Sequence, residues 1–201
     1  MSHYFKHDET LDHELKSYDV TIKGISLRLF TDRGVFSRDG LDQGSRLLME
    51  NIDIEKHVKR VVDMGCGYGP IGLFIAKSYP DIEVTLCDVN ERALVLSEKN
   101  QAENQIVNVK IVQSDLFEHV DQGVDMVVTN PPIRAGKAVV FRLYEEACQH
   151  LSEGGGFYCV IRKKQGAPSS MKKIEQVFGN VTIVAKNKGF WLLLAKKVKN
   201  D

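Results

Sequence analysis

The sequence predicts an α/β fold: a doubly wound, mainly parallel sheet of seven strands with a reversed last strand, preceded by a short β-hairpin. From residue 60 onward, short runs rich in β-branched residues alternate with helical segments, as in parallel sheets with crossover helices. Residues 186–189 alone separate the last two runs, which is too short a connection for a parallel crossover, so these strands pair antiparallel. A chain of 201 residues with 43% hydrophobic residues can bury one substantial core.

The N-terminal elements are predicted from the presence or absence of alternation. Residues 1–18 show no periodicity and are expected to form a loose leader before a single domain over 19–201. Residues 20–30 alternate apolar and polar side chains around a Lys-Gly turn, which indicates a hairpin. A loop over 34–44 then leads to a helix that begins at Ser45.

The remaining elements follow from the switch between strand-like and helix-like periods. The predicted strands are 60–64, 83–88, 109–114, 125–130, 156–161, 181–185 and 190–196. The predicted helices are 70–78, 91–104, 138–151 and 169–178.

Composition narrows the possible function. No apolar run reaches the roughly 20 residues of a membrane helix, and the polar N-terminus does not resemble a secretory signal, so a cytoplasmic protein is expected. The four cysteines show no CxxC pairing, which predicts neither disulfides nor a metal site. Net charge is zero, yet residues 157–201 carry 10 basic and 2 acidic side chains, which indicates either a polyanion-binding face or an ordinary solvated one. Oligomeric state is left open.

A glycine loop follows the first core strand and marks a cofactor site. Gly65, Gly67 and Gly69 allow a sharp turn and a close approach of a ligand to the backbone, and Pro70 can begin the next helix. The string Gly67-x-Gly69-x-x-Gly72 also matches the dinucleotide fingerprint, so the loop by itself leaves nicotinamide and other adenosine cofactors open.

Three carboxylates at successive strand ends favour S-adenosylmethionine. Asp63 would repel a pyrophosphate but can hold an ammonium group, directly or through water. Asp88 can accept both hydroxyls of a ribose, and Asp115 can accept from an adenine amino group. The alternative for each one is a loop or helix-capping role. The predicted cofactor-binding residues are Asp63, Gly65, Cys66, Gly67, Asp88, Val89, Ser114, Asp115 and Leu116.

The catalytic candidates are Asn130, Pro131 and Pro132, directly after the fourth core strand. Two prolines fix the backbone and remove two donors, which leaves the Asn130 amide oxygen and the Pro131 carbonyl as an acceptor pair. A planar amino group is a weak nucleophile until its hydrogens are engaged and its nitrogen pyramidalises. Two positioned acceptors can do this and aim the lone pair at a methyl donor. The alternative is a purely structural turn.

These motifs together resemble a known family. Asp-x-Gly-x-Gly at 63–67 with the Asn-Pro-Pro motif is similar to the class I S-adenosylmethionine methyltransferases of Rossmann-like fold that modify amino or amide nitrogens, over residues 60–198. The loop 34–45 and the strand 84–89 further resemble the catalytic half of the bacterial small-subunit ribosomal RNA methyltransferase C family. The resemblance implies the 2-amino group of a guanosine in ribosomal RNA as substrate, and RNA or the small ribosomal subunit as partner.

The resemblance also implies substrate-binding residues. Phe36 and Ser37 are expected in a lid near cofactor and base. The family usually carries an aromatic residue after Asn-Pro-Pro that stacks on the base, whereas this chain has Ile133 and Arg134, so stacking must come from elsewhere, such as Phe36, or be replaced by Ile133. The longer family members carry an additional N-terminal domain, which is not expected in this chain. RNA recognition is then expected from Arg134, Lys137, Arg162, Lys163, Lys164, Lys172 and Lys173.

Other functions remain open on the sequence. The same fold and motif serve enzymes that methylate the glutamine amide of release factors, or adenine or cytosine in DNA. A cofactor-binding module that only docks on RNA or protein, and an NAD-dependent oxidoreductase, are the alternatives from other classes.

Overall fold

Strands and helices alternate along the chain as predicted. The computed structural model describes residues 14–33 and 40–198. Its strands are β1 (Lys16–Ile22), β2 (Ile25–Thr31), β3 (Arg60–Met64), β4 (Glu83–Asp88), β5 (Val109–Gln113), β6 (Val124–Thr129), β7 (Leu151–Arg162), β8 (Thr182–Asn187) and β9 (Phe190–Lys196). Its helices are α1 (Gln43–Asn51), α2 (Pro70–Ser78), α3 (Glu91–Glu103), α4 (Lys137–His150) and α5 (Ala167–Phe178), with 3-10 turns η2 (Ile133–Ala135) and η3 (Lys163–Gln165).

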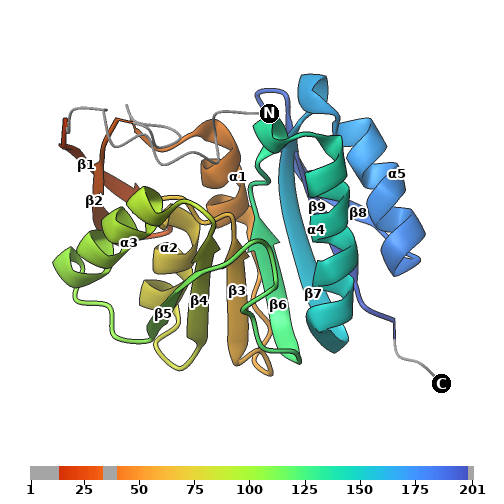
Figure 1. Ribbon diagram of the computed structural model, residues 1–201, viewed down its shortest axis with the longest axis horizontal. Helices are drawn as coiled ribbons and strands as arrows, with labels where there is room; N and C mark the ends of the chain where they lie inside the picture. The colour runs from red at the N-terminus through yellow and green to blue at the C-terminus, as the bar shows by residue number, and fades with distance from the viewer. Residues whose placement is uncertain (1–13, 34–39, 199–201) are drawn as a thin grey trace.

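The seven-stranded sheet has the order β5-β4-β3-β6-β7-β9-β8, and the β1–β2 hairpin forms a separate two-stranded sheet. Strands β3 to β7 pair parallel, whereas β9 runs antiparallel to both of its neighbours. This confirms the predicted fold class, including the reversed last strand, which lies between β7 and β8 (Figure 1).

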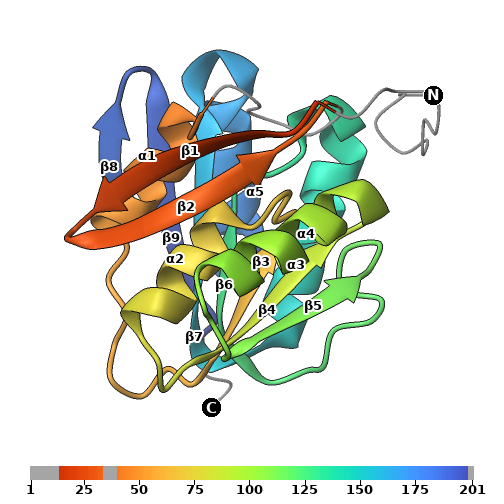
Figure 2. The same cartoon turned by 90° about the vertical axis from the view of Figure 1, so that its left-hand side faces the viewer.

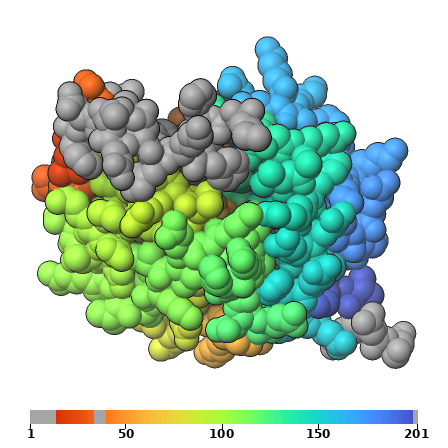
Figure 3. Space-filling view, in the orientation of Figure 1, coloured from red at the N-terminus to blue at the C-terminus, as the bar shows by residue number. Residues whose placement is uncertain are grey.

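Helices cover both faces of the sheet, so the central strands are buried on each side. Helices α1, α2 and α3 lie on one face, and α4 and α5 lie on the other (Figures 1 and 2). In the space-filling view α4 and α5 lie side by side on the surface (Figure 3). In β6, Val127 packs into the core under α4 and α5 while Val128 packs into the core under α1 and α2. This pattern explains why the central strands are nearly continuous apolar runs.

The β1–β2 hairpin is attached to α3 by side-chain amides. Asn100 accepts a hydrogen bond from the Phe30 amide at 2.7 Å and donates to the Phe30 carbonyl at 3.1 Å. Asn104, one helical turn later, makes the same pair with Arg28 at 3.0 and 2.8 Å. These four bonds occupy an edge that would otherwise be open for pairing.

Three of the differences from the predicted boundaries have an identifiable cause. The strand β1 begins at Lys16, inside the expected leader. The sequence does not indicate this start, because the first residues of the strand are exposed and polar. The strand β7 begins at Leu151 instead of 156, since a register shift against β6 keeps its glycine-rich start in the sheet. Helix α1 begins at Gln43, before the predicted Ser45, because Asp42 caps it. No helix within the described residues is long and apolar enough to cross a membrane.

Candidate active site

A pocket of about 250 Å³ opens at the carboxyl ends of the parallel strands, where open α/β sheets bind ligands. The predicted site residues that line it are Gly65, Cys66, Gly67, Asp88, Val89, Ser114, Asp115, Leu116, Asn130, Pro131, Pro132, Ile133 and Arg134. It is also lined by Asp42, Ser45, Met64, Tyr68, Pro70, Ile71, Val139, Leu143, Ile161, Arg162, Gln165 and Phe190. Asp63 does not line it, and Phe36 and Ser37 lie outside the described residues.

The glycine loop after β3 is fixed by bonds that leave its outer side open. Gly65 and Gly67 have φ values of 70° and 58°, the region that favours glycine. The Gly67 amide donates to Asp88 at 2.9 Å, and its carbonyl accepts from the Ser97 hydroxyl at 2.8 Å. A Cβ added at Gly67 would meet no atom within 4 Å. The loop is therefore rigid and exposes bare backbone to a ligand.

Asp63 lies beneath this loop, where it joins β3 to α2. Its Oδ2 accepts from the Gly72 amide at 2.8 Å, in the first turn of α2, while its Oδ1 is buried without a partner among the described residues. Burial raises the pKa of this carboxyl to about 7. The helix-capping alternative thus applies to one oxygen, and the unpaired oxygen is a feature that a bound cation would satisfy.

The other two predicted carboxylates lie in the pocket wall. Both oxygens of Asp88 accept backbone amides, from Asn90 and Gly67, each at 2.9 Å, and burial raises its pKa. Each oxygen keeps a second lone pair for a hydroxyl donor. Asp115 is exposed and pairs with Arg142 on α4, so an adenine amino group would share its carboxylate with that guanidinium. Beside it, Ser114 accepts from the His119 amide at 3.0 Å.

The loop after β6 packs directly against the glycine loop. The Thr129 hydroxyl donates to the Met64 carbonyl at 2.8 Å, and Pro132 Cδ lies 3.7 Å from the position of a Cβ added at Gly65. The Pro131 carbonyl accepts from the Ile133 amide at 2.8 Å, as in an inverse γ-turn centred on Pro132. The sequence predicts this carbonyl as an unpaired acceptor. In the structure one of its two lone pairs is used by the Ile133 amide, and the other remains for a ligand.

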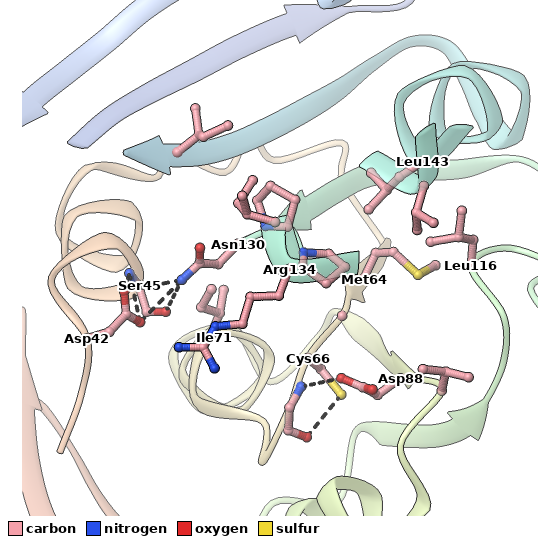
Figure 4. A pocket seen from close by; sticks show the side chains of 18 of the residues that line it. Asp42, Ser45, Met64, Cys66, Ile71, Asp88, Leu116, Asn130, Arg134 and Leu143 are labelled. Atoms are coloured by element: carbon pink, nitrogen blue, oxygen red, sulfur yellow. Dashed lines mark hydrogen bonds between the residues drawn. The ribbon is translucent and has the colours of Figure 1, made fainter. Parts of the chain in front are cut away.

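Asn130 is held by α1. Its Nδ2 donates to the Asp42 carboxylate at 3.2 and 3.3 Å and to the Ser45 hydroxyl at 3.2 Å, so the side chain points toward α1 (Figure 4). Asp42 in turn caps α1 by accepting from the Gly44 and Ser45 amides. Because a carboxylate can only accept, it fixes which end of the amide is nitrogen. The Asn130 Oδ1 is thereby left as a preset acceptor at the pocket.

Sequence reasoning missed the partners of Asn130. The string Asp42-x-x-Ser45 before an apolar run is a recognisable helix start, so the cap itself had a local signal. The contact between Asp42 and Asn130 joins residues 88 positions apart, and nothing in the local sequence indicates it. The sequence predicts Phe190 only as the first residue of a strand, yet its side chain lines the pocket.

Comparison with known proteins identifies the family. The model of the methyltransferase small domain matches residues 26–194. The chain belongs to this family. Its members use S-adenosylmethionine as methyl donor, which confirms the cofactor predicted from the carboxylates and the glycine loop.

Several curated proteins are similar in sequence to this chain. "Uncharacterized protein YbxB" of Bacillus subtilis is 42% identical over 198 residues, which are 98% of either chain. Ribosomal RNA small subunit methyltransferase C of Pasteurella multocida is 34% identical over 168 residues, 82% of this chain and 50% of the relative. The chain thus spans about half the length of the small subunit methyltransferase C relatives that it matches.

Solved structures share the architecture of this methyltransferase. A T. thermophilus 16S rRNA N2 methyltransferase, solved with AdoMet and guanosine, aligns over 91% of this chain and 50% of its own with a TM-score of 0.77 at 24% identity. M. jannaschii TYW2, solved with AdoMet, aligns over 92% of this chain and 87% of its own with a TM-score of 0.63 at 18% identity. At these identities the likeness establishes the fold.

Proposed function

We propose that this methyltransferase modifies an exocyclic amino nitrogen, namely the 2-amino group of a guanosine in ribosomal RNA. The observation that carries the proposal is the Asn130 amide, whose nitrogen is held by Asp42 and Ser45 while its oxygen stays available beside the glycine loop. An acceptor fixed before the substrate arrives needs no reorganisation when the amine binds.

The residues around the glycine loop suit S-adenosylmethionine, which when bound supplies an electrophilic methyl carbon on a sulfonium. Asp88 is placed to accept from the ribose hydroxyls, and the unpaired Asp63 oxygen suits the ammonium group, directly or through water. Gly65 and Gly67 present bare backbone to the ligand. For the adenine end we assign Val89, Ser114, Asp115 and Leu116, and Cys66 of the glycine loop lines the same pocket.

The chain's own part in the reaction is to bind and orient the amine. Asn130 Oδ1 accepts one amino hydrogen, and the remaining lone pair of the Pro131 carbonyl accepts the other, with Pro132 holding that carbonyl in place. With both hydrogens engaged, the nitrogen lone pair is turned out of conjugation. No strong base is required, because the amine proton becomes acidic as positive charge develops on nitrogen.

Charge and relatives support ribosomal RNA as the substrate. The matched relatives named ribosomal RNA small subunit methyltransferase C act, by their name, on ribosomal RNA. Residues 157–201 carry 10 basic and 2 acidic side chains, and Arg134 and Arg162 bring positive charge to the pocket wall. Such a substrate would place the enzyme in the cytoplasm.

The proposal is tested by nucleoside analysis of ribosomal RNA from a strain that lacks this protein. We expect one 2-methylguanosine to disappear from the small-subunit RNA and to return with the wild-type gene, but not with Asn130→Ala. The Asn130→Ala protein should bind S-adenosylmethionine as wild type does, because Asn130 lies outside the glycine loop. Unchanged RNA, with lost methylation of a protein glutamine, an adenine or a cytosine, would reassign the substrate. No lost methylation anywhere would indicate a docking module.

A further inference from the structure

We propose that Phe190 and Arg162 form the subsite that stacks on the target guanine and reads its O6/N7 edge, a proposal that rests on the function proposed above. Asn130 follows β6, which lies between β3 and β7 in the sheet, so the pocket has one side at the ends of β3, β4 and β5 and another at β7 and β9. Strands β3, β4 and β5 end at the glycine loop, Asp88 and Ser114, whereas β7 and β9 meet the pocket at Arg162 and Phe190. Because the side of β3, β4 and β5 is assigned to S-adenosylmethionine, the amine should approach from the β7–β9 side.

Arg162 and Phe190 face the same space as the residues that hold Asn130. They are paired across β7 and β9, and two residues further into the sheet Val160 and Leu192 pack in the core beneath α1. Because side chains alternate along strands, Arg162 and Phe190 point toward the α1 side as well. The register of the two strands thus places a cation and an aromatic ring together beside α1.

Gly44 makes room for the aromatic ring. A Cβ added at Gly44 would lie 3.0 Å from Phe190 Cδ1 and Cε1, and 3.0 Å from Asp42 Oδ1. The Phe190 ring and Asp42 therefore lie side by side against Gly44, and Asp42 is the residue that grips Asn130. Phe190 is half-buried, with one part packed on the core and another lining the pocket. This leaves an aromatic surface within reach of a base whose amine is at Asn130.

Arg162 supplies donors next to that ring. Its guanidinium carbon lies 5.8 Å from the centroid of Phe190, and it makes no ion pair with any carboxylate in the described part of the chain. Thr129 is paired with Cys159, so Arg162 lies one strand across from Asn130 and two residues nearer the pocket mouth. At about 4.8 Å between strands and 3.3 Å per residue, this offset matches the width of a purine plus side-chain reach.

Guanine chemistry fits the two positions. The 2-amino group lies at one side of the base, and O6 and N7 are acceptors on the other, which arginine reads with two donors. Adenine presents a donor at the position of O6, so the same arginine selects against it. Phe190 provides the stacking surface that Ile133 does not. The subsite thus explains both the choice of guanine and the absence of an aromatic residue after Asn-Pro-Pro.

The test is equilibrium binding of GMP and 7-deaza-GMP, measured by NMR titration on the full chain. The two probes share the phosphate and differ in the N7 acceptor, so phosphate contacts cancel in their ratio. Wild type should prefer GMP by about tenfold, and Arg162→Ala should weaken GMP binding and bind both probes equally. Phe190→Leu, which keeps an apolar side chain, should weaken both probes by about tenfold and leave the preference intact, and Phe190→Trp should restore binding.

Lys188→Ala is the matched control, because Lys188 is an exposed cation in the turn between β8 and β9 that does not line the pocket. It should keep the preference, and any weakening should vanish in high salt. The proposal is overturned if Arg162→Ala retains the preference, if Phe190→Leu binds as wild type, or if wild type binds neither probe. None of these outcomes decides the proposed function, which stands or falls on the RNA nucleoside analysis.

Discussion

Asp42→Asn tests the amine grip without removing the helix cap. Asparagine caps helices about as well as aspartate, so α1 should keep its start and lose only the charge at its positive end, about 0.3–1 kcal/mol. The charged acceptor of the Asn130 amide is lost as well. Asparagine still offers a neutral oxygen to Asn130, so the loss is the difference between a charged and a neutral hydrogen bond, about 1–1.5 kcal/mol, and the rate of methyl transfer should fall by roughly 5- to 13-fold.

Single-turnover methyl transfer with labelled cofactor measures this rate, and calorimetry measures cofactor affinity separately. Asp42→Asn should lower the rate at saturating RNA while the affinity for S-adenosylmethionine stays at the wild-type value. Asp42→Ala leaves no acceptor for Asn130, so it should lower the rate by roughly 10- to 150-fold and also lose the cap, with about 1 kcal/mol less stability. Ser45→Ala, which removes a neutral hydroxyl partner of Asn130, should cost less than tenfold.

Two results would refute this reasoning. If Asp42→Asn transfers methyl groups at the wild-type rate, Asn130 does not depend on its charged partner. If each variant loses methyl-transfer rate only in proportion to its loss of folding stability, Asp42 contributes only by capping α1. Its bond to Asn130 then has no part in the chemistry.

Three further outcomes concern the cofactor side. A Cβ at Gly72 would lie 2.1 Å from Leu86 Cδ2, so Gly72→Ala should lower the free energy of unfolding by about 1–3 kcal/mol in urea denaturation. An unchanged midpoint would contradict this packing. Asp88→Asn should weaken S-adenosylmethionine about tenfold by calorimetry, and equal affinity would remove Asp88 from the ribose site. Asp63 has a folded pKa raised to about 7, so its contribution to stability is fully present below about pH 4 and is lost as pH rises through 7. The free energy of unfolding of Asp63→Asn, measured by urea denaturation, should therefore rise relative to that of wild type between about pH 4 and pH 7. Parallel pH profiles of the two proteins would show that the carboxyl is not buried.

The predictable parts of the fold are those where one local signal suffices. Residues 60–64 and 70–78 were predicted as they occur, because a buried apolar strand, a glycine loop and a proline at the helix start coincide there. The start of β1 at Lys16 was missed, since its exposed polar residues are in a strand only because they pair with Phe30 and Thr31.

The candidate site divides along the same line. Gly65, Gly67 and Asp88 could be chosen from the sequence because each follows directly from a strand end, and all three line the pocket. Asp63 has the same signal, yet its orientation is decided by the Gly72 amide across the turn. The contact of Asp42 with Asn130 depends on how α1 packs over the sheet, which no local pattern specifies.

The charges of the pocket follow its division at Asn130. Asp88 lines the pocket on the side of the glycine loop, with Asp63 buried beneath that loop, and a cationic sulfonium and its ammonium group are expected on this side. Arg162 lies on the β7–β9 side, where an RNA substrate would arrive. Because Thr129 and Pro132 contact the start of the glycine loop at Met64 and Gly65, β3 and β6 hold the two sides of the pocket in a fixed relation. Substrate preference can therefore change at β7 and β9 without disturbing the cofactor side, as the separate effects expected for the Arg162 and Asp88 substitutions would show.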